Sequence, residues 1–245
     1  MNMIFKIAKT ELQTLFYSPV AWLILIVFTF QASILFTGTF GMSVRSQALE
    51  YEVGNLTLFT FGGDYGLFTH IQQYLYLYIP LLTMGLMSRE LSSGSIKLLY
   101  SSPVTNKEIV LGKYFAMLVY GLVLIGILAI YVLYSACTIK AFDFTVVLSG
   151  LLGLYLLICA YASIGLFMSS LTSYQVVSAM GTLAILAALS LVRGMWQDIE
   201  FVREITYWLS INGRVDEFVN GLICSEDILY FLIVITLFLT LTILR

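Results

Sequence analysis

The chain has 245 residues, of which 60% are hydrophobic and only 11% are charged. Soluble domains average about 25% charged residues, so this composition excludes an ordinary water-soluble enzyme. With a net charge of −2 and long charge-free stretches, we expect an all-α polytopic membrane protein made of a single domain, residues 1–245, with no nucleic-acid partner.

The first segment, about residues 3–17, has apolar residues near helical spacing and polar residues between them, which predicts an amphipathic helix. Such a helix lies in the headgroup plane of the bilayer, and Pro19 then lets the chain turn into the first span. Lys6 and Lys9 on this interfacial helix are candidate contacts to headgroups or to a partner. The alternative is a plain N-terminal extension of the first span.

Six apolar stretches come close to the roughly 20 residues that are needed to cross about 30 Å of hydrocarbon. The longest charge-free stretch, 144–192, is long enough for two spans joined by a polar turn at 169–175. Six spans place both termini on the same side of the membrane. The expected spans are about 19–40, 70–88, 110–139, 144–168, 174–193 and 227–244.

The distribution of Lys and Arg predicts which side faces the cytoplasm. With the N-terminus inside, seven of the twelve basic residues lie on the cytoplasmic side. We therefore expect a multi-pass protein of the cytoplasmic (inner) membrane with both termini in the cytoplasm. The first apolar stretch lacks a small-residue cleavage site before Arg45, so we expect it to remain as a span.

The most informative segment is a polar, net-positive loop at 89–113, RELSSGSIKLLYSSPVTNKEIVLGK, between the second and third spans. Its pattern predicts a short helix over 90–99, then a turn, then a helix start where Thr105 and Glu108 have capping-box spacing. A basic loop between spans marks the cytoplasmic face and offers a surface to a soluble partner. On these residues alone, a docking surface and an ordinary solvated loop are equally supported.

The segment between the last two spans, about 194–226, is amphipathic rather than apolar. Its residues alone suit a solvated connection with aromatic anchors. Its acids at 216–217 and 226–227 are adjacent in sequence and point different ways on a helix, so we expect them to be solvated. Cys137, Cys159 and Cys224 lack metal-ligand spacing, and we expect them to be small buried hydrophobes.

An energy source within the chain is not evident from the sequence. Gly112 and Lys113 are followed by Tyr114, so no G-x-x-x-x-G-K-[ST] nucleotide-binding loop is formed. The apolar spans also lack the ionisable residues that a proton relay or a membrane-embedded enzyme would need. We therefore expect no catalytic, cofactor-binding or metal-binding residue in this chain, and an external source of energy.

The loop at 89–113 resembles the signature loop of ABC-2 type transporter permeases, and 210–232 is similar to the segment that leads such permeases into their last span, with Phe218, Gly221 and Asp227 in place. Within this family the chain is most similar to the GldF-like permeases of gliding motility, and more distantly to the NosY-like permeases. It departs from the family pattern at Ser95, where Thr is common, and at Ile96-Lys97, where an acid often sits. The loop elements are Arg89, Glu90, Gly94, Ser95, Leu98, Leu99, Ser102, Pro103, Glu108, Gly112 and Lys113.

The resemblance implies an ABC-2 permease fold driven by a pair of ATPase subunits, which bind ATP and Mg and dock on a coupling loop at about 89–109. It also implies a second permease copy or, as we favour, a larger paralogous membrane subunit. The outer segment, with Trp208, Phe218 and Gly221, would be re-entrant and close the translocation path. The implied ATPase contacts are Arg89, Glu90, Gly94, Ser95, Lys97 and Leu98.

The resemblance favours export by a gliding-motility-associated complex. One alternative has the same sequence features. The chain would then be a membrane anchor, or an ATP-driven mechanotransmitting subunit of a motility or secretion machine, that moves no substrate.

Overall fold

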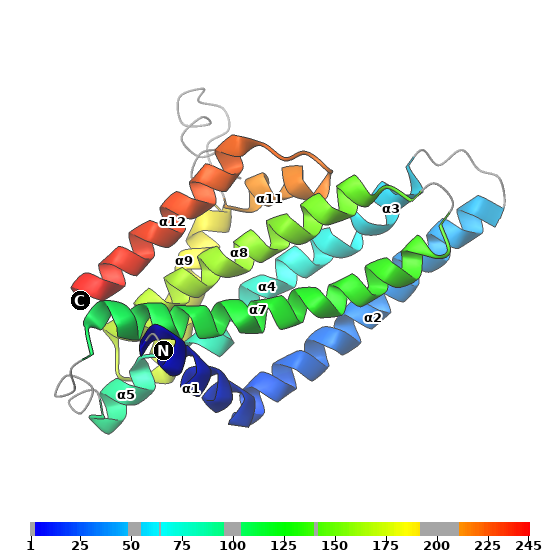
Figure 1. The fold of residues 1–245 in the computed structure, drawn as a ribbon. Coiled ribbons are helices and arrows are strands. Elements are labelled where there is room, and N and C mark those ends of the chain that lie inside the picture. Colours follow the sequence, from blue (N-terminus) through cyan, green and yellow to red (C-terminus); the bar gives the residue numbers. More distant parts are fainter. Residues whose placement is uncertain (1–2, 49–54, 64, 96–103, 140–141, 192–210) are drawn as a thin grey trace.

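Long apolar stretches of the sequence form long helices that run side by side (Figure 1). The computed structural model describes residues 3–48, 55–63, 65–95, 104–139, 142–191 and 211–245, and all regular structure within these ranges is helical. The helices are α1 (Met3–Tyr17), α2 (Pro19–Ala48), α3 (Leu56–Phe61), α4 (Leu67–Thr83), α5 (Ser88–Ser93), α7 (Asn106–Ala136), α8 (Phe144–Leu171), α9 (Gln175–Leu191), α11 (Ile211–Val219) and α12 (Ser225–Leu244).

Helix α8 is the centre of the bundle and packs against α4, α7, α9, α11 and α12. Of its most apolar 18-residue stretch, 67% is buried, compared with 28–39% in α2, α7 and α12. Gly153 on α8 allows close packing, because a Cβ built there would lie 2.5 Å from the Cβ of Phe218 on α11. Helices α2, α7 and α12 therefore leave a larger share of their residues at the outer surface than α8 does.

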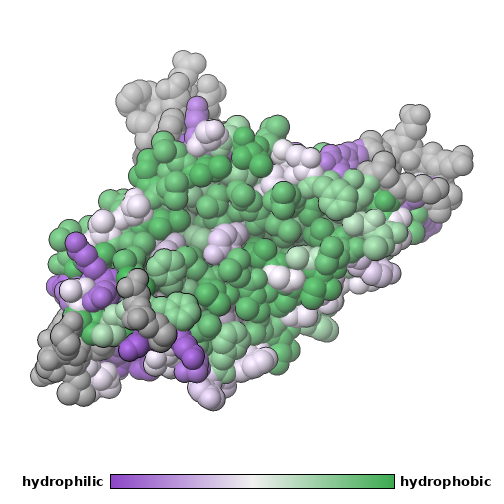
Figure 2. All heavy atoms as spheres, in the orientation of Figure 1, coloured by the Kyte–Doolittle hydropathy of each residue, from purple (hydrophilic) through white to green (hydrophobic). Residues whose placement is uncertain are grey.

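The outer surface of the bundle is strongly apolar. Figure 2 shows a broad hydrophobic face, with hydrophilic residues gathered toward the two ends of the bundle. Exposed Leu, Ile, Val and Phe side chains lie on α2, α7 and α12, among them Phe30, Leu122 and Leu237. An apolar surface of this extent suits lipid rather than water, and the helices satisfy their own backbone groups as a hydrocarbon environment requires.

Four helices in the described ranges are long and apolar enough to cross a membrane: α2, α7, α8 and α12. The two other expected spans, 70–88 and 174–193, correspond to α4 and α9, each of 17 residues. A helix of that length rises roughly 25 Å, short of the about 30 Å of a hydrocarbon core. The expected span at 70–88 is shortened because the chain turns after Thr83 and Ser88 already belongs to α5. The predicted count of six spans is thus not reproduced by helix length.

Helix α1 lies against the N-terminal part of α7, and the chain turns at Ser18 into α2. The indole of Trp22 donates a 2.7 Å hydrogen bond to the carbonyl oxygen of Phe16 and packs edge-on against its ring, which fixes the turn. Both chain termini lie at the end of the bundle that carries α5 (Figure 1). This end also holds the charged residues of the candidate site.

Candidate functional site

A buried lysine joins three helices at the α5 end of the bundle. The Nζ atom of Lys113, near the start of α7, donates to Glu11 Oε1 of α1 at 2.6 Å and to Glu90 Oε1 of α5 at 2.6 Å. Its third hydrogen bond, 2.7 Å long, goes to the carbonyl oxygen of Leu86, just before α5. The Lys113 side chain is 1% exposed, so its charge is compensated almost entirely within the protein. We call Lys113, Glu11 and Glu90 the Lys113 cluster.

The sequence places a glycine where α1 must come close to α7. A Cβ built on Gly112 would lie 2.7 Å from the Cβ of Ile7, closer than real Cβ atoms approach. With no side chain at this position, α1 can rest directly on α7. Glu11, one helical turn further along α1, then lies within hydrogen-bond reach of Lys113. In the Gly-Lys pair of the sequence motif, Gly112 therefore permits the close contact of α1 with α7, and Lys113 forms the hydrogen bond between these two helices.

Helix α5 is held at its first turn by a side chain from another helix. Ser169, near the end of α8, accepts hydrogen bonds from the backbone N–H groups of Met87 and Ser88 at 2.9 and 3.0 Å. Its hydroxyl also donates to the carbonyl oxygen of Met84 at 2.9 Å, at the end of α4. Met87 supplies no side-chain cap of its own, so Ser169 satisfies N–H groups that would otherwise lack partners.

At its other end α5 stops earlier than the sequence pattern predicts. Gly94 adopts φ +71°, a left-handed conformation in which glycine carries no steric penalty and which commonly ends a helix. The expected helix over 90–99 is therefore wrong in extent, because the described helix ends at Ser93. The capping box is confirmed: Thr105 Oγ1 accepts from the N–H of Glu108, whose carboxylate accepts from the N–H of Thr105, and α7 begins at Asn106.

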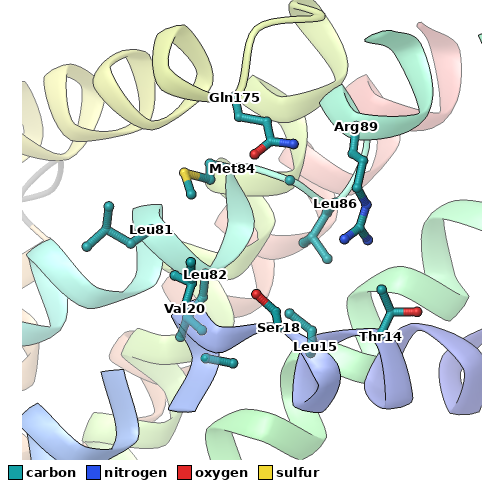
Figure 3. A pocket seen from close by; sticks show the side chains of 12 residues that line it. Thr14, Leu15, Ser18, Val20, Leu81, Leu82, Met84, Leu86, Arg89 and Gln175 are labelled. Carbon is teal, nitrogen blue, oxygen red and sulfur yellow. The ribbon is translucent and has the colours of Figure 1, made fainter. Parts of the chain in front are cut away.

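A small hollow of about 90 Å³ lies beside the Lys113 cluster, between the α1–α2 turn and the α4–α5 turn. Arg89, Gln175 and Ser18 are among the side chains that line it (Figure 3). The Nη2 atom of Arg89 lies 3.9 Å from Glu11 Oε2, and its side chain is 46% exposed. An ion pair this long and this exposed adds little to stability, so the Lys113 hydrogen bonds carry most of the connection between α1 and α5.

The predicted ATPase contacts fall into three groups. Arg89 is exposed on α5, whereas Glu90 is turned inward to Lys113 with 18% of its side chain exposed. Gly94 ends α5, and the hydroxyl of Ser95 lies 2.8 Å from that of Ser93. The remaining two contacts, Lys97 and Leu98, lie outside the described residues.

The interfacial-helix candidates Lys6 and Lys9 are both exposed on α1. Glu11, on the same helix, is buried against Lys113. Helix α1 therefore presents its two lysines outward and its one acid inward.

A second buried ion pair lies where α11 meets the start of α12. The guanidinium of Arg214 donates from Nη1 to Asp227 Oδ1, and both residues are 2% exposed. The Arg214 Cζ atom also lies 4.6 Å from the centre of the Tyr230 ring, a cation–π contact. The prediction that these acids are solvated is wrong for Asp227. The prediction considered only the directions of neighbouring side chains on one helix. The partner of Asp227 on α12 is Arg214, which lies on α11.

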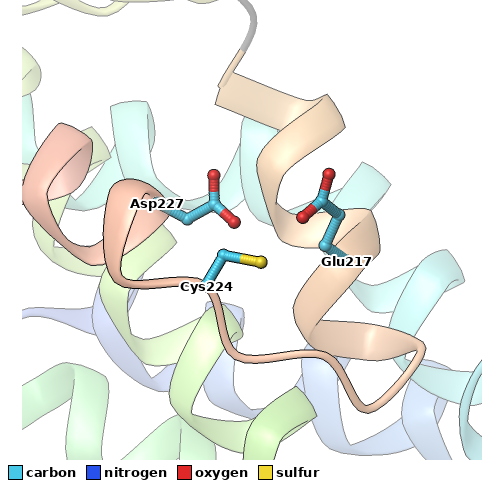
Figure 4. Close-up of side chains that lie close together, drawn as sticks. All are labelled: Glu217, Cys224 and Asp227. Atoms are coloured by element: carbon cyan, nitrogen blue, oxygen red, sulfur yellow. The ribbon is translucent and has the colours of Figure 1, made fainter.

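Glu217 and Cys224 lie beside this pair, with ligand atoms of Glu217, Cys224 and Asp227 within 4.8 Å of one another (Figure 4). These three side chains offer two carboxylate oxygens and a sulfur, a set that metals such as zinc accept. Arg214 compensates the charge of Asp227. The hydrogen bond to Glu217, with nearby acids, raises the pKa of the Cys224 thiol. Cys137 and Cys224 are exposed, so only Cys159 is buried as expected.

The outer-segment candidates that the structure describes are part of the packed core. Phe218 is fully buried, with its ring 6.4 Å from that of Phe231 on α12. Gly221 follows α11 with φ +91° and packs on Val146 of α8. Trp208 lies outside the described residues. Helix α11 is thus a short helix held against the bundle rather than a free loop.

From the sequence, Lys113 was a motif position and Glu90 a predicted ATPase contact, but the bond between them was not foreseen, and Glu11 and Ser169 were missed. One available signal is a lysine flanked by Gly112 and an apolar run, because a cation in such a position needs buried partners. No local pattern identifies which residues those partners are.

The long apolar helices and their apolar outer surface define a multi-pass membrane protein. The chain belongs to the ABC-2 family of transporter membrane proteins, since the family described as "ABC-2 family transporter protein" matches residues 5–245, nearly the whole chain. It is therefore a permease subunit of an ABC transporter rather than a catalytic subunit, and members of this family generally work with an ABC ATPase subunit. No curated protein matched the chain.

Proposed function

We propose that this chain is the export permease of an ATP-driven complex and that α5 is its coupling helix. Separate ATPase subunits, which bind the ATP and Mg, would dock on the segment 89–109. The observation that supports this proposal is the Lys113 cluster, because it bonds α5 directly to α1 and α7. A push on α5 would then reach a long apolar helix through hydrogen bonds rather than through a flexible loop.

Helix α5 suits this role because it is short, exposed on one side and held on the other. Arg89, Ser92 and Ser93 are exposed, whereas Ser88 is buried beneath Ser169 and Glu90 is bonded to Lys113. Packed and hydrogen-bonded elements move as units, so a partner that grips the exposed side would move the α4–α5 turn and the start of α7 together.

The membrane arrangement we propose has six spans, with α4 and α9 counted among them. Both are packed against α8, and a span somewhat shorter than the hydrocarbon core is tolerated at modest cost. Helix α1 would lie at the cytoplasmic surface with Lys6 and Lys9 outward, and both termini would face the cytoplasm. A membrane-impermeant maleimide should then label the exposed Cys137 and Cys224 in intact cells.

We place the chain among the GldF-like permeases of gliding motility on its sequence resemblance, paired with a larger paralogous membrane subunit. In this arrangement α11 would close the far end of the path. The burial of Phe218 against α8 and α12 supports a fixed closure of this kind rather than a loose loop.

The test is affinity purification of the tagged chain from its native membrane in mild detergent, followed by ATPase assays on what is recovered. We expect an ABC ATPase and a second membrane subunit to come with it. Glu90→Lys puts a second cation beside Lys113 and should abolish coupling, so that stimulation of ATP hydrolysis by membrane extract is lost. Arg45→Gln, which removes an exposed cation on α2 outside the segment 89–109, is the matched control.

Three results would contradict parts of the proposal. Recovery of the chain alone would remove the ATPase partner. Wild-type stimulation in Glu90→Lys would remove α5 from the coupling path. An ATPase that assembles normally but never responds to any extract would favour the alternative, an anchor or mechanotransmitting subunit that moves no substrate.

A further inference from the structure

An apolar groove separate from the Lys113 cluster runs between α1 and α7 and has a volume of about 550 Å³. Phe5 and Ala8 line it from α1, and Phe115 and Val119 line it from α7. Phe5, Phe115 and Val119 are 64%, 46% and 42% exposed, so their side chains form open walls rather than a closed core. This volume falls within the roughly 300–1,000 Å³ of ligand pockets. The lining suits a hydrocarbon chain.

One charged residue, Lys9, lines the groove. Lys6 is exposed one helical turn before it on α1. The nearest acid on this helix, Glu11, is buried and bonded to Lys113. The rim of the groove on α1 therefore carries positive charge that no neighbouring acid of the same helix offsets.

The groove lies along the part of α7 where charged residues give way to an apolar run. Lys113 is the last charged residue of α7, and Phe115 lies only two residues further toward the apolar middle of the helix. A lipid whose chain lies against Phe115 and Val119 would place its phosphate beside Lys9. Cationic residues at this depth attract anionic headgroups.

From these observations we propose that the groove is a binding site for one anionic phospholipid of the surrounding leaflet. The acyl chain lies between α1 and α7, and the headgroup phosphate binds the ammonium of Lys9, with Lys6 adding long-range attraction. The bound lipid fills space between α1 and α7 that the protein itself leaves open. The proposal rests on the membrane location of the chain and is independent of the ATPase partner.

The test uses the full chain, purified in detergent together with whatever co-purifies. Phosphatidylglycerol and phosphatidylcholine with the same photoactivatable acyl chain are added separately, and the lipid attached per chain is measured by intact mass. Peptide mapping then locates the attachment. We expect phosphatidylglycerol to be preferred and to attach at Phe115 and Val119.

Four variants distinguish a specific contact between Lys9 and the headgroup phosphate from non-specific electrostatic attraction of the lipid. A lysine near an anionic surface is worth about 1 kcal/mol, so Lys9→Gln should lower the preference for phosphatidylglycerol about fivefold. Lys9→Arg should retain it, and so should Lys107→Gln, an exposed lysine outside the groove. Ala8→Phe should fill the groove and abolish attachment there without lowering the thermal midpoint of the chain.

Equal attachment of the two lipids to the wild type would overturn the proposal, because the groove would then accept acyl chains without selecting a headgroup. An equal loss in Lys9→Gln and Lys107→Gln would overturn it as well, since bulk charge would be responsible. Attachment of protein rather than lipid at Phe115 in native membranes would show that a subunit covers the groove.

Discussion

Replacement of Lys113 by methionine removes the ammonium group that α1, α5 and the α4–α5 turn share, while it keeps a side chain of similar length. Three hydrogen bonds are lost together, to Glu11, to Glu90 and to the carbonyl oxygen of Leu86. The two carboxylates are left close together without their shared cation. This variant therefore tests whether the Lys113 cluster stabilises the junction.

The size of the effect follows from burial. Removal of one partner from a buried ion pair costs about 3–5 kcal/mol, because the other charge is left uncompensated. Glu11 and Glu90 retain 12% and 18% exposure, so water can partly solvate them and the expected cost is about 3 kcal/mol. Arg89→Met removes a 3.9 Å pair whose arginine is 46% exposed, and should cost about 0–1 kcal/mol.

The free energy of unfolding of the full chain is measured in mixed micelles by titration with a denaturing detergent, for the wild type and both variants. Hydrogen exchange of α1 and α5 amides is followed in the same samples, because a loss at the junction should loosen these helices before α8. The triple variant Lys113→Met, Glu11→Gln, Glu90→Leu removes all three charges and should recover most of the lost stability.

Two results would contradict this prediction: a cost of Lys113→Met no larger than that of Arg89→Met, or a triple variant less stable than Lys113→Met alone. Either result would mean that the cluster is an incidental contact. The junction would then depend on apolar packing of α1 against α7.

Three further predictions concern other contacts. Ser169→Ala removes the acceptor for two N–H groups at the start of α5 and should cost about 1 kcal/mol, with faster amide exchange in α5 and unchanged exchange in α12. Gly112→Val places a Cβ 2.7 Å from the Cβ of Ile7 and should lower stability by about 1–3 kcal/mol in a thermal scan. Ile7→Gly in the same chain removes the opposing Cβ and should recover part of that loss. The pKa of the Cys224 thiol is raised, and only the thiolate form reacts with alkylating agents. At a pH of about 8.5, the ordinary pKa of a cysteine, Cys224 should therefore react more slowly than a free thiol, and its rate should increase as the pH is raised further. Glu217→Gln removes the main cause of that shift and should accelerate alkylation at the same pH, whereas an unchanged rate would show that Glu217 does not hold the proton on the thiol.

Features that depend on residues a few positions apart were predictable from the sequence. The capping box of Thr105 and Glu108 involves residues three apart, and α7 does begin there. The apolar runs predicted long helices for the same reason, because length and hydropathy are local properties. The end of α5 at Gly94 also had a local signal, a glycine after a polar helical turn, but the apolar residues at 96–99 outweighed it.

Features that depend on distant residues were not predictable from one sequence. Glu11 and Lys113 are 102 positions apart, and their contact requires α1 to fold back onto α7. The burial of Asp227 likewise depends on Arg214 arriving from another helix. Helix patterns show which faces are apolar but not which helices meet, so the partners of a buried charge emerge only with the tertiary structure.

The sharing of one cation by two acids constrains how this chain can change over evolutionary time. A substitution at Lys113, Glu11 or Glu90 alone leaves a buried charge without its counterpart, whereas a coordinated replacement of all three leaves none. Related permeases should therefore differ at these positions as a set, with all three charges present or all three absent. Covariation of this kind would link α1 to α5 in sequence data, although no regular pattern along the chain connects them.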